Sequence, residues 1–272
     1  KLDFTRRCLE LLLEERSPLL HEIVVVDNAS PDGTAAYLEA LAAGEPLVKV
    51  VSPGENLGFV GGNNLAAASA NGELLVFLNN DTEPVRGWLE AMVERLESSP
   101  TIGAVGAKLV YGDGRLQEAG GIVFSDASGW NYGRGDDPTR PLYTFPRDVD
   151  YCSAACLLVR RDTFERLGRF DERYAPAYYE DTDLCFGIRS LGLRVVYEPR
   201  AVVVHHEGTT AGTDTGSGAK RHQVLNRETF RAKWAQELTR QQPPDPALVR
   251  RASNRAAGAR VLVVDPLLPL YD

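Results

Sequence analysis

The chain has 272 residues, of which 43% are apolar and 25% are charged, and its formal net charge is −8. This composition is typical of a globular α/β protein rather than a disordered chain. The acidic balance argues against a nucleic-acid-binding protein, so we expect no nucleic-acid partner. The longest apolar runs, such as residues 23–26, have the length of a strand, and no segment is expected to span a bilayer.

The four cysteines, Cys8, Cys152, Cys156 and Cys185, are scattered through the apolar pattern. Cys152 and Cys156 lack a second pair of ligands at the spacing of a zinc site, so we expect buried thiols rather than a metal site. Free thiols fit a reducing cytoplasm.

The first hundred residues alternate between strand and helix patterns. The pattern predicts strands over residues 21–27, 47–51 and 74–78, and helices over 5–15, from about 34 to 41, around 66–70, and over 89–96. Residues 74–78 are apolar on both faces, which favours a central, parallel strand. The alternation predicts an α/β fold, a doubly wound, mixed but mostly parallel sheet with helices on both faces.

In such a sheet, ligands bind beyond the carboxyl ends of the strands. Asp27 ends the first predicted strand, the glycine-rich turn over residues 56–64 follows the second, and Asp81 follows the third. These three features lie at one edge of the sheet and predict a single nucleotide-binding crevice.

The second half of the chain has a looser pattern. Residues 111–148 are too long for a plain connector, so we expect them to be functional. Further elements are a strand over 149–160, helices over 162–167 and 181–191, strands over 194–197 and 201–205, a loop over 207–218, and a last helix through Phe230, Trp234 and Leu238.

Two acidic runs carry the functional argument. Residues 78–81 end a buried strand, where a carboxylate can hold a metal ion. Residues 179–184 open an amphipathic helix, where a carboxylate can be aimed into a cleft. A metal-holding acid and a proton-accepting acid are the minimum set for moving a group off a nucleotide diphosphate.

Taken in order, five runs resemble the inverting, metal-dependent GT-A glycosyltransferases of family two, especially bacterial, rhamnosyltransferase-like enzymes that extend cell-surface polysaccharides. The resemblance covers residues 1 to about 238. It rests on residues 26–30, on 56–59 with Asn63 and Asn64, on 78–81, on 180–184, and on His205 and His206 followed by Gly208 and Thr210.

The resemblance implies a uridine- or thymidine-diphosphate sugar as donor. Asp27 would accept a hydrogen bond from the imide of the base. The family often has arginine where Asn63 stands, so the base contact there is expected to differ. The other donor-binding residues implied are Asn28, Ser30, Asn56, Gly58, Phe59, Asn64, Asn79 and Asn80.

The resemblance also implies a divalent cation. Asp81 matches the last acid of the family's DxD motif, whereas the first acid is Asn79 here. Carboxylate and carbonyl oxygens suit Mg²⁺ or Mn²⁺, and His205 as a further ligand would favour Mn²⁺. His206 is the alternative ligand.

Asp181 would be the catalytic base that takes the proton from the attacking acceptor hydroxyl, and Glu180 would hold an acceptor hydroxyl. The implied acceptor is a glycan or a lipid-linked saccharide. Asp183 we expect to be structural, because acids in the first turn of a helix favour its dipole. Read singly, Asp27 and Asp81 could merely cap turns, and His205 could be a core histidine.

The resemblance divides the chain into a GT-A domain over residues 1–238, a linker over 239–259 and an orphan strand over 260–272. We expect the first strand of the GT-A sheet to be missing, because the chain opens with a helix. Residues 260–272 resemble the start of a second, GT-B-type domain. One hypothesis is that residues 261–265 fill the place of the missing strand.

Two other functions stay open: a sugar-1-phosphate nucleotidyltransferase, and a non-catalytic nucleotide- or glycan-binding module of a larger synthase. A nicotinamide oxidoreductase is disfavoured because the turn after Val26 lacks the glycine fingerprint. Residues 219–260 carry ten Lys or Arg against three Asp or Glu. This segment is either a solvated helix and linker or a peripheral contact with anionic lipid at the cytoplasmic, inner face of the membrane.

Overall fold

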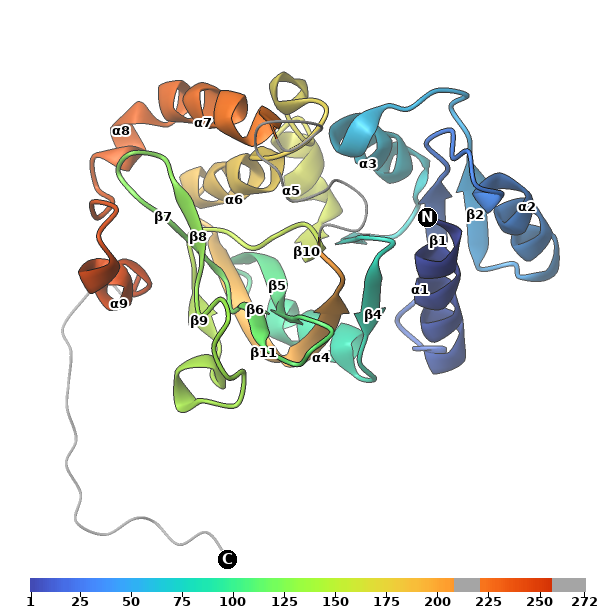
Figure 1. Cartoon of the computed structure of the whole chain (residues 1–272), viewed down its shortest axis with the longest axis horizontal. Coiled ribbons are helices and arrows are strands. Elements are labelled where there is room, and N and C mark those ends of the chain that lie inside the picture. Colours follow the sequence, from blue (N-terminus) through green and yellow to red (C-terminus); the bar gives the residue numbers. More distant parts are fainter. Residues whose placement is uncertain (208–220, 256–272) are drawn as a thin grey trace, which may run out of the picture.

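The computed structural model describes residues 1–207 and 221–255. A central mixed sheet has helices on both faces (Figure 1), which confirms the predicted α/β fold. The residues Gly208 and Thr210 of the last resembling run, and the hypothesis on residues 261–265, lie outside the described ranges.

The main sheet has the strand order β3-β10-β5-β11-β4. Strand β11 runs parallel to β5, whereas β10 runs antiparallel to both β3 and β5. Two short strands pair at its margins, β6 with β5 and β9 with β11. The bounds are β3 Leu74–Leu78, β4 Thr82–Pro84, β5 Ile102–Val110, β6 Leu116–Glu118, β9 Arg147–Asp148, β10 Cys156–Arg160 and β11 Arg194–His205.

The expectation that residues 74–78 form a central, parallel strand was wrong. Strand β3 ends the hydrogen-bonded path of the main sheet and is antiparallel to its neighbour β10. Leu75 and Phe77 join one hydrophobic core, while Leu74, Val76 and Leu78 pack against the other. Helices on both faces therefore account for the continuous apolar run, without parallel pairing.

The two cores lie on opposite faces of the sheet. Helices α1 (Leu2–Glu15) and α4 (Trp88–Glu97) cover one face. Helices α3 (Gly58–Ser69), α5 (Arg161–Arg166) and α6 (Glu180–Ser190) cover the other, with α7 (Arg221–Lys233) outside α6 (Figure 1). Helix α2 (Thr34–Gly44) flanks a separate pair of strands.

That separate pair consists of β1 (Ile23–Val26) and β2 (Val48–Val51), which run parallel. Among the described residues, β1 pairs with β2 alone and β3 with β10 alone, so each presents an edge without a strand partner. All residues of both edges line the same cavity. The two edges therefore border the same side of the cavity.

The predicted excursion over residues 111–148 is a well-packed layer. It contains β6, the hairpin of β7 (Gly121–Val123) and β8 (Gly129–Asn131), and β9. Leu116, Ile122 and Phe124 are fully buried in the core. The layer thereby fixes polar side chains of β6 at the cavity described below.

The described part of the predicted linker also packs on the domain. Helices α8 (Ala235–Leu238) and α9 (Val249–Ala252) follow α7, and Ala252 is buried in the core. Arg255 forms an ion pair with the buried Asp150. Residues up to 255 are thus docked rather than a plain connector.

All four cysteines are free and buried, as predicted. Within residues 1–207 and 221–255, no helix is long and apolar enough to cross a bilayer.

Asp183 joins α6 to the segment that follows it. Its side chain accepts hydrogen bonds from the Tyr174 hydroxyl (3.0 Å) and the Trp234 indole (2.7 Å), and it pairs with Lys233 (2.7 Å). Only 5% of Asp183 is exposed. Its partners from outside the helix fit the structural role expected for this acid.

We expect Asp183→Ala to lower the free energy of unfolding by about 3 kcal/mol, because it leaves two buried donors and a lysine without their acceptor. Chemical denaturation measures this change. Asp113→Ala is the control: Asp113 forms an exposed ion pair with Arg115, so its loss should cost less than about 1 kcal/mol. Equal unfolding midpoints for the two variants would contradict the assignment.

Candidate active site

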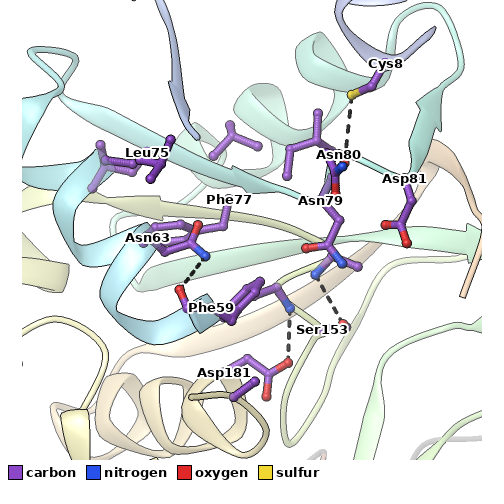
Figure 2. A pocket seen from close by; sticks show the side chains of 18 of the residues that line it. Cys8, Phe59, Asn63, Leu75, Phe77, Asn79, Asn80, Asp81, Ser153 and Asp181 are labelled. Carbon is purple, nitrogen blue, oxygen red and sulfur yellow. Dashed lines mark hydrogen bonds between the residues drawn. The ribbon is translucent and has the colours of Figure 1, made fainter. Parts of the chain in front are cut away.

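A cavity of about 2240 Å³ extends from the edges of β1 and β3 to the start of α6. Asp27, Asp81 and Asp181 all line it. Figure 2 shows Asn79 and Asp81 on one side of this opening and Asp181 on the other, with Ser153 between them. The structure therefore brings together the three acids singled out from the sequence, although more than 150 residues separate the first from the last.

Asp81 and His205 face each other within the cavity. Asp81 follows β3, and His205 is the last residue of β11, which pairs with β4 through the register His205 to Thr82. The His205 Nε2 lies 3.4 Å from Asp81 Oδ1 and 3.4 Å from the Asn79 amide nitrogen. A carboxylate, an imidazole and an amide thus converge at one point.

Gln117 of β6 orients this imidazole. Its amide nitrogen donates to Glu207 (3.1 Å), so its carbonyl oxygen is the atom that faces His205 Nδ1 (3.0 Å). In the neutral tautomer that fits this contact, Nδ1 carries the proton and the lone pair of Nε2 is directed toward Asp81 and Asn79. Such an outer partner is typical of a metal-binding histidine.

Asp81 and His205 fit a divalent cation whose other ligands come from a bound molecule. Two groups 3.4 Å apart can both reach an ion at the usual ligand distance of about 2.1 Å. Within the described ranges, no group of three His, Cys, Asp or Glu could hold a metal ion unaided. The remaining ligands would have to be water or phosphate oxygens of the donor.

His206 is not part of this site. Its Nε2 pairs with Glu83 at 2.8 Å and its ring packs against Phe4, whereas His205 lines the cavity. Neighbouring residues point to opposite sides at the end of a strand. The sequence left both histidines open, and the structure favours His205.

On the Asp27 side of the cavity, the turn after β1 and the glycine-rich turn before α3 are joined by hydrogen bonds. Asp27 Oδ1 accepts the amide hydrogen of Ser30 (3.2 Å). Asn28 donates to the Gly58 carbonyl (3.1 Å) and accepts from the Leu57 amide (3.2 Å). Asn28 therefore fixes the glycine-rich turn against the end of β1. The predicted donor residues on this side that line the cavity are Asp27, Asn28, Ser30, Asn56, Gly58, Phe59 and Asn63.

Gly58 is required by a close approach. Its φ is +69°, and a Cβ there would lie 2.7 Å from the Pro176 Cβ. The carbonyl of Pro176 accepts hydrogen bonds from the amides of Phe59 (2.7 Å) and Val60 (3.1 Å). These contacts join the start of α3 to the loop before α6. The amides at the start of α3 are occupied by this contact rather than offered to a phosphate group.

Asn64 is not brought to the cavity. Its amide donates to the Phe170 carbonyl (2.9 Å) and accepts from the Phe170 amide (3.0 Å). Asn63, its neighbour on α3, does line the cavity. Consecutive helical residues point about 100° apart, so only one of the pair can face the same space. We assign Asn64 a structural role. Asn79 and Asn80, also predicted, both line the cavity.

Asp181 and Glu180 begin α6 at the cavity wall. Asp181 accepts hydrogen bonds from the amides of Ala154 (3.2 Å) and Thr182 (2.6 Å) and is only partly buried. Desolvation outweighs these bonds and raises the pKa of Asp181 above its usual value. Glu180 is 5% exposed, and burial together with the charge of Asp181 raises its pKa as well. A carboxylate with a raised pKa is a better proton acceptor.

A further carboxyl group, Glu118 of β6, was missed by the sequence analysis. It lines the cavity, is 1% exposed, and accepts the amide hydrogen of Ser153 (3.0 Å). Burial raises the pKa of Glu118 to about 8, and the charge of Asp181 acts in the same direction. A glutamate in the apolar run from Leu116 to Phe124 was the signal available in the sequence.

Residues 1–168 match the sequence model described as glycosyl transferase family 2. The chain is 34% identical over 210 residues to the O-antigen biosynthesis protein RfbC of Myxococcus xanthus, a match that covers 75% of this chain and 16% of that protein. It is 29% identical over 226 residues to the N-acetylglucosaminyl-diphospho-decaprenol L-rhamnosyltransferase of Mycobacterium tuberculosis, covering 74% of this chain and 71% of that protein. The chain thus spans a small part of the first relative and most of the second.

Among solved structures, the chain resembles GalNAc-T7 in a crystal structure with UDP, GalNAc and Mn²⁺. The TM-score is 0.70 at 18% sequence identity, covering 88% of this chain and 47% of that chain. At this identity the likeness concerns the fold, which is the predicted GT-A fold.

We expect the Glu118→Gln variant to change the pH dependence of stability. A carboxyl group whose pKa is raised by folding stabilises the native state fully below about pH 4.5, and this stabilisation is lost as the pH rises through about 8. Glutamine cannot ionise. The melting temperature of the variant relative to the wild type should therefore rise between pH 5 and pH 9.

Scanning calorimetry at several pH values measures this difference. Glu39→Gln, at an exposed position of α2, is the control and should show no such trend. A difference between Glu118→Gln and the wild type that is the same at pH 5 and pH 9 would contradict the buried, protonated state.

Proposed function

Since the chain belongs to glycosyl transferase family 2, we propose that it transfers a sugar from a nucleotide diphosphate donor to a hydroxyl group of a glycan or lipid-linked saccharide, with inversion at the anomeric carbon. The observation that carries this proposal is the meeting of Asp27, Asp81 and Asp181 in one cavity. It supplies a polar anchor for a base, an acid for a cation and an acid for a proton.

The donor we propose is a uridine- or thymidine-diphosphate sugar. Asp27 sits at the end of β1, where its carboxylate can accept a hydrogen bond from the imide N–H that uracil and thymine share. Asn28, Ser30, Asn56 and Asn63 offer further polar groups on this side. GalNAc-T7, which shares the fold, was crystallised with UDP.

Asp81 and His205 would hold Mg²⁺ or Mn²⁺; the Asn79 amide nitrogen faces His205, and a turn of this amide would present its carbonyl oxygen to the cation. When bound, the cation would neutralise charge on the leaving diphosphate. An imidazole ligand favours Mn²⁺, the ion present with GalNAc-T7. Gln117 keeps the His205 ring in the orientation that this ligation needs.

Asp181 is the proposed base. The acceptor oxygen attacks the anomeric carbon, the bond from that carbon to the diphosphate oxygen breaks, and the acceptor proton passes to the Asp181 carboxylate. The amides of Ala154 and Thr182 hold that carboxylate in place. Glu180, next to it and buried, can bind an acceptor hydroxyl. A single in-line displacement inverts the configuration.

The proposed acceptor is a lipid-linked or polymeric saccharide. Two relatives carry names that point this way: an O-antigen biosynthesis protein and a rhamnosyltransferase acting on N-acetylglucosaminyl-diphospho-decaprenol. The start of α7 lines the same cavity through Arg221, His222 and Gln223, and the next residues, Val224 and Leu225, are 57% and 61% exposed.

We propose that this part of α7 rests on anionic lipid at the cytoplasmic face of the membrane. Exposed apolar side chains beside a basic segment suit such a surface. Contact there would bring the cavity mouth close to a lipid-linked acceptor.

We expect Asp181→Asn to lower kcat by about 10²–10⁴-fold while donor binding persists, because the amide cannot accept the proton. Asp81→Ala should instead weaken UDP binding in the presence of Mn²⁺ and not in its absence. Steady-state kinetics and calorimetric titration with UDP measure these effects. Asp113→Asn, at the exposed turn, is the control for both.

Normal turnover by Asp181→Asn would refute the base assignment. A thermal-shift panel of nucleoside diphosphates with and without Mn²⁺ identifies base and cation, because a bound ligand stabilises the fold by mass action. Exchange of pyrophosphate into a nucleoside triphosphate would favour the nucleotidyltransferase. Donor binding without transfer to any acceptor or to water would favour the non-catalytic module.

We expect the double variant Val224→Ser with Leu225→Ser to bind vesicles containing phosphatidylserine about tenfold more weakly than the wild type, because less apolar surface leaves water. Vesicle co-sedimentation measures this binding, and added salt should weaken vesicle binding by both the wild type and the double variant. Val85→Ser removes an apolar side chain of similar exposure elsewhere and is the control. Equal binding by all three proteins would refute a role for α7.

A further inference from the structure

One carboxyl oxygen of Glu118 lacks a hydrogen-bond partner among the described residues. Its Oε1 is bound by the Ser153 amide, while its Oε2 is fully buried and has no hydrogen-bond partner among the described residues. A buried polar atom left without a partner costs on the order of 1–3 kcal/mol. Because Glu118 lines the cavity, a molecule bound there can supply the partner.

Trp130 of β8 presents an aromatic surface to the same cavity. Trp88 and Trp234 are only 3% and 9% exposed, whereas Trp130 is 37% exposed. Its ring meets Phe124 edge to face, at a centroid distance of 4.9 Å. Phe124 supports one border of the indole, which leaves part of its surface accessible from the cavity.

The hairpin that carries Trp130 is fixed beside the proposed base. The Tyr179 hydroxyl, from the residue before α6, donates to the Ala127 carbonyl in the hairpin turn (2.8 Å). The Tyr151 hydroxyl donates to Asn131, next to Trp130 (3.0 Å). These two hydrogen bonds fix the position of Trp130 relative to the start of α6. A fixed position is what a site needs in order to orient a reactant.

Glu118 and Asp181 are held by consecutive backbone amides. The Ser153 amide donates to Glu118 and the Ala154 amide to Asp181. Their carboxyl groups are therefore neighbours at one wall of the cavity. Two hydroxyls of a single sugar ring, one bound by each carboxyl group, fit this arrangement.

We propose that Glu118 and Trp130 form an acceptor subsite, in which a pyranose ring of the acceptor packs its C–H face on the Trp130 indole and hydrogen-bonds to the Glu118 carboxyl group. A saccharide suits this site because it combines apolar ring faces with hydroxyls that both donate and accept. An apolar wall with a few placed polar groups is the usual form of a small-molecule site. The inference rests on the proposed glycosyl transfer and adds the group that the acceptor contacts.

A direct test is a ¹⁵N-labelled NMR titration of the full chain, which has three indole N–H signals. Trp130→Phe assigns the Trp130 signal by its disappearance. We expect methyl glycosides of glucose, rhamnose and N-acetylglucosamine, added with UDP and the diamagnetic ion Mg²⁺, to shift the Trp130 signal. The signals of the buried Trp88 and Trp234 should stay in place. A Trp130 signal that none of these glycosides moves would overturn the proposal.

Variants test each contact in the same titration. Trp130→Ala and Glu118→Ala should each weaken glycoside binding by on the order of tenfold, judged for Trp130→Ala from ligand saturation transfer. Glu118→Gln keeps a hydrogen-bonding side chain and should retain most of the affinity. Phe145→Ala, at an aromatic residue that is 50% exposed and does not line the cavity, is the control. Unchanged affinity in both alanine variants would refute the subsite.

Release of UDP from a UDP-sugar, with water as acceptor, separates this proposal from the wider one. If the wild type binds no nucleotide and releases none, the proposed glycosyl transfer fails. If the wild type releases nucleotide and both alanine variants bind UDP as it does, but glycoside binding is unaffected in the variants, only the acceptor subsite fails. Weaker glycoside binding in the variants, with UDP binding kept, supports the subsite.

Discussion

The backbone amides of Ser153 and Ala154 hold the carboxyl groups of Glu118 and Asp181 at one wall of the cavity. Glu118 comes from β6 and Asp181 from the start of α6, so the turn before β10 sets the spacing between an inserted layer and a helix. An ionised carboxyl group is costly in a desolvated place, which raises the pKa of both acids, and the amide hydrogen bonds offset part of that cost. The backbone leading to Asp181 is itself unusual: Tyr178 and Tyr179 both have positive φ, at 78° and 73°. Such conformations each cost about 1–3 kcal/mol and concentrate at functional sites.

The wall that carries Asp81 and His205 is built differently. Gln117 orients His205, and within the described ranges Asp81 and His205 belong to no group of three His, Cys, Asp or Glu that could hold a cation, so other ligands would have to complete the site. Cation and nucleotide binding would therefore be strongly coupled, since each supplies part of the other's site. The same strand, β6, supplies Gln117 to this wall and Glu118 to the other. A short strand inside the inserted layer thus links the proposed metal side to the proposed acceptor side.

Much of this arrangement could be predicted from the sequence, because the acids lie where elements begin or end. Asp27 and Asp81 follow apolar strands, and Asp181 opens a helix. The choice between His205 and His206 depends on which way a strand faces, and the choice between Asn63 and Asn64 on how a helix is turned. Glu118 and Gln117 lie outside the five runs and gain their role from packing against distant residues, so a glutamate among apolar residues was the one weak sign of this site in the sequence. The direction of β3 was also hidden, since an apolar run records burial on two faces and not the orientation of its neighbour.

The edges of β1 and β3 have a consequence for the behaviour of this chain in solution. Main-chain N–H and C=O groups along such edges are templates for pairing with any extended peptide, and their apolar side chains add attraction. An extended segment bound between the two edges would pair with both β1 and β3. It would join the β1–β2 pair to the main sheet, so that the domain would unfold as one cooperative unit. If the two edges stay unpaired, they can pair with the edges of other copies, and this self-association would increase with protein concentration. The same backbone groups would therefore affect both the solubility of the protein and the cohesion of the domain.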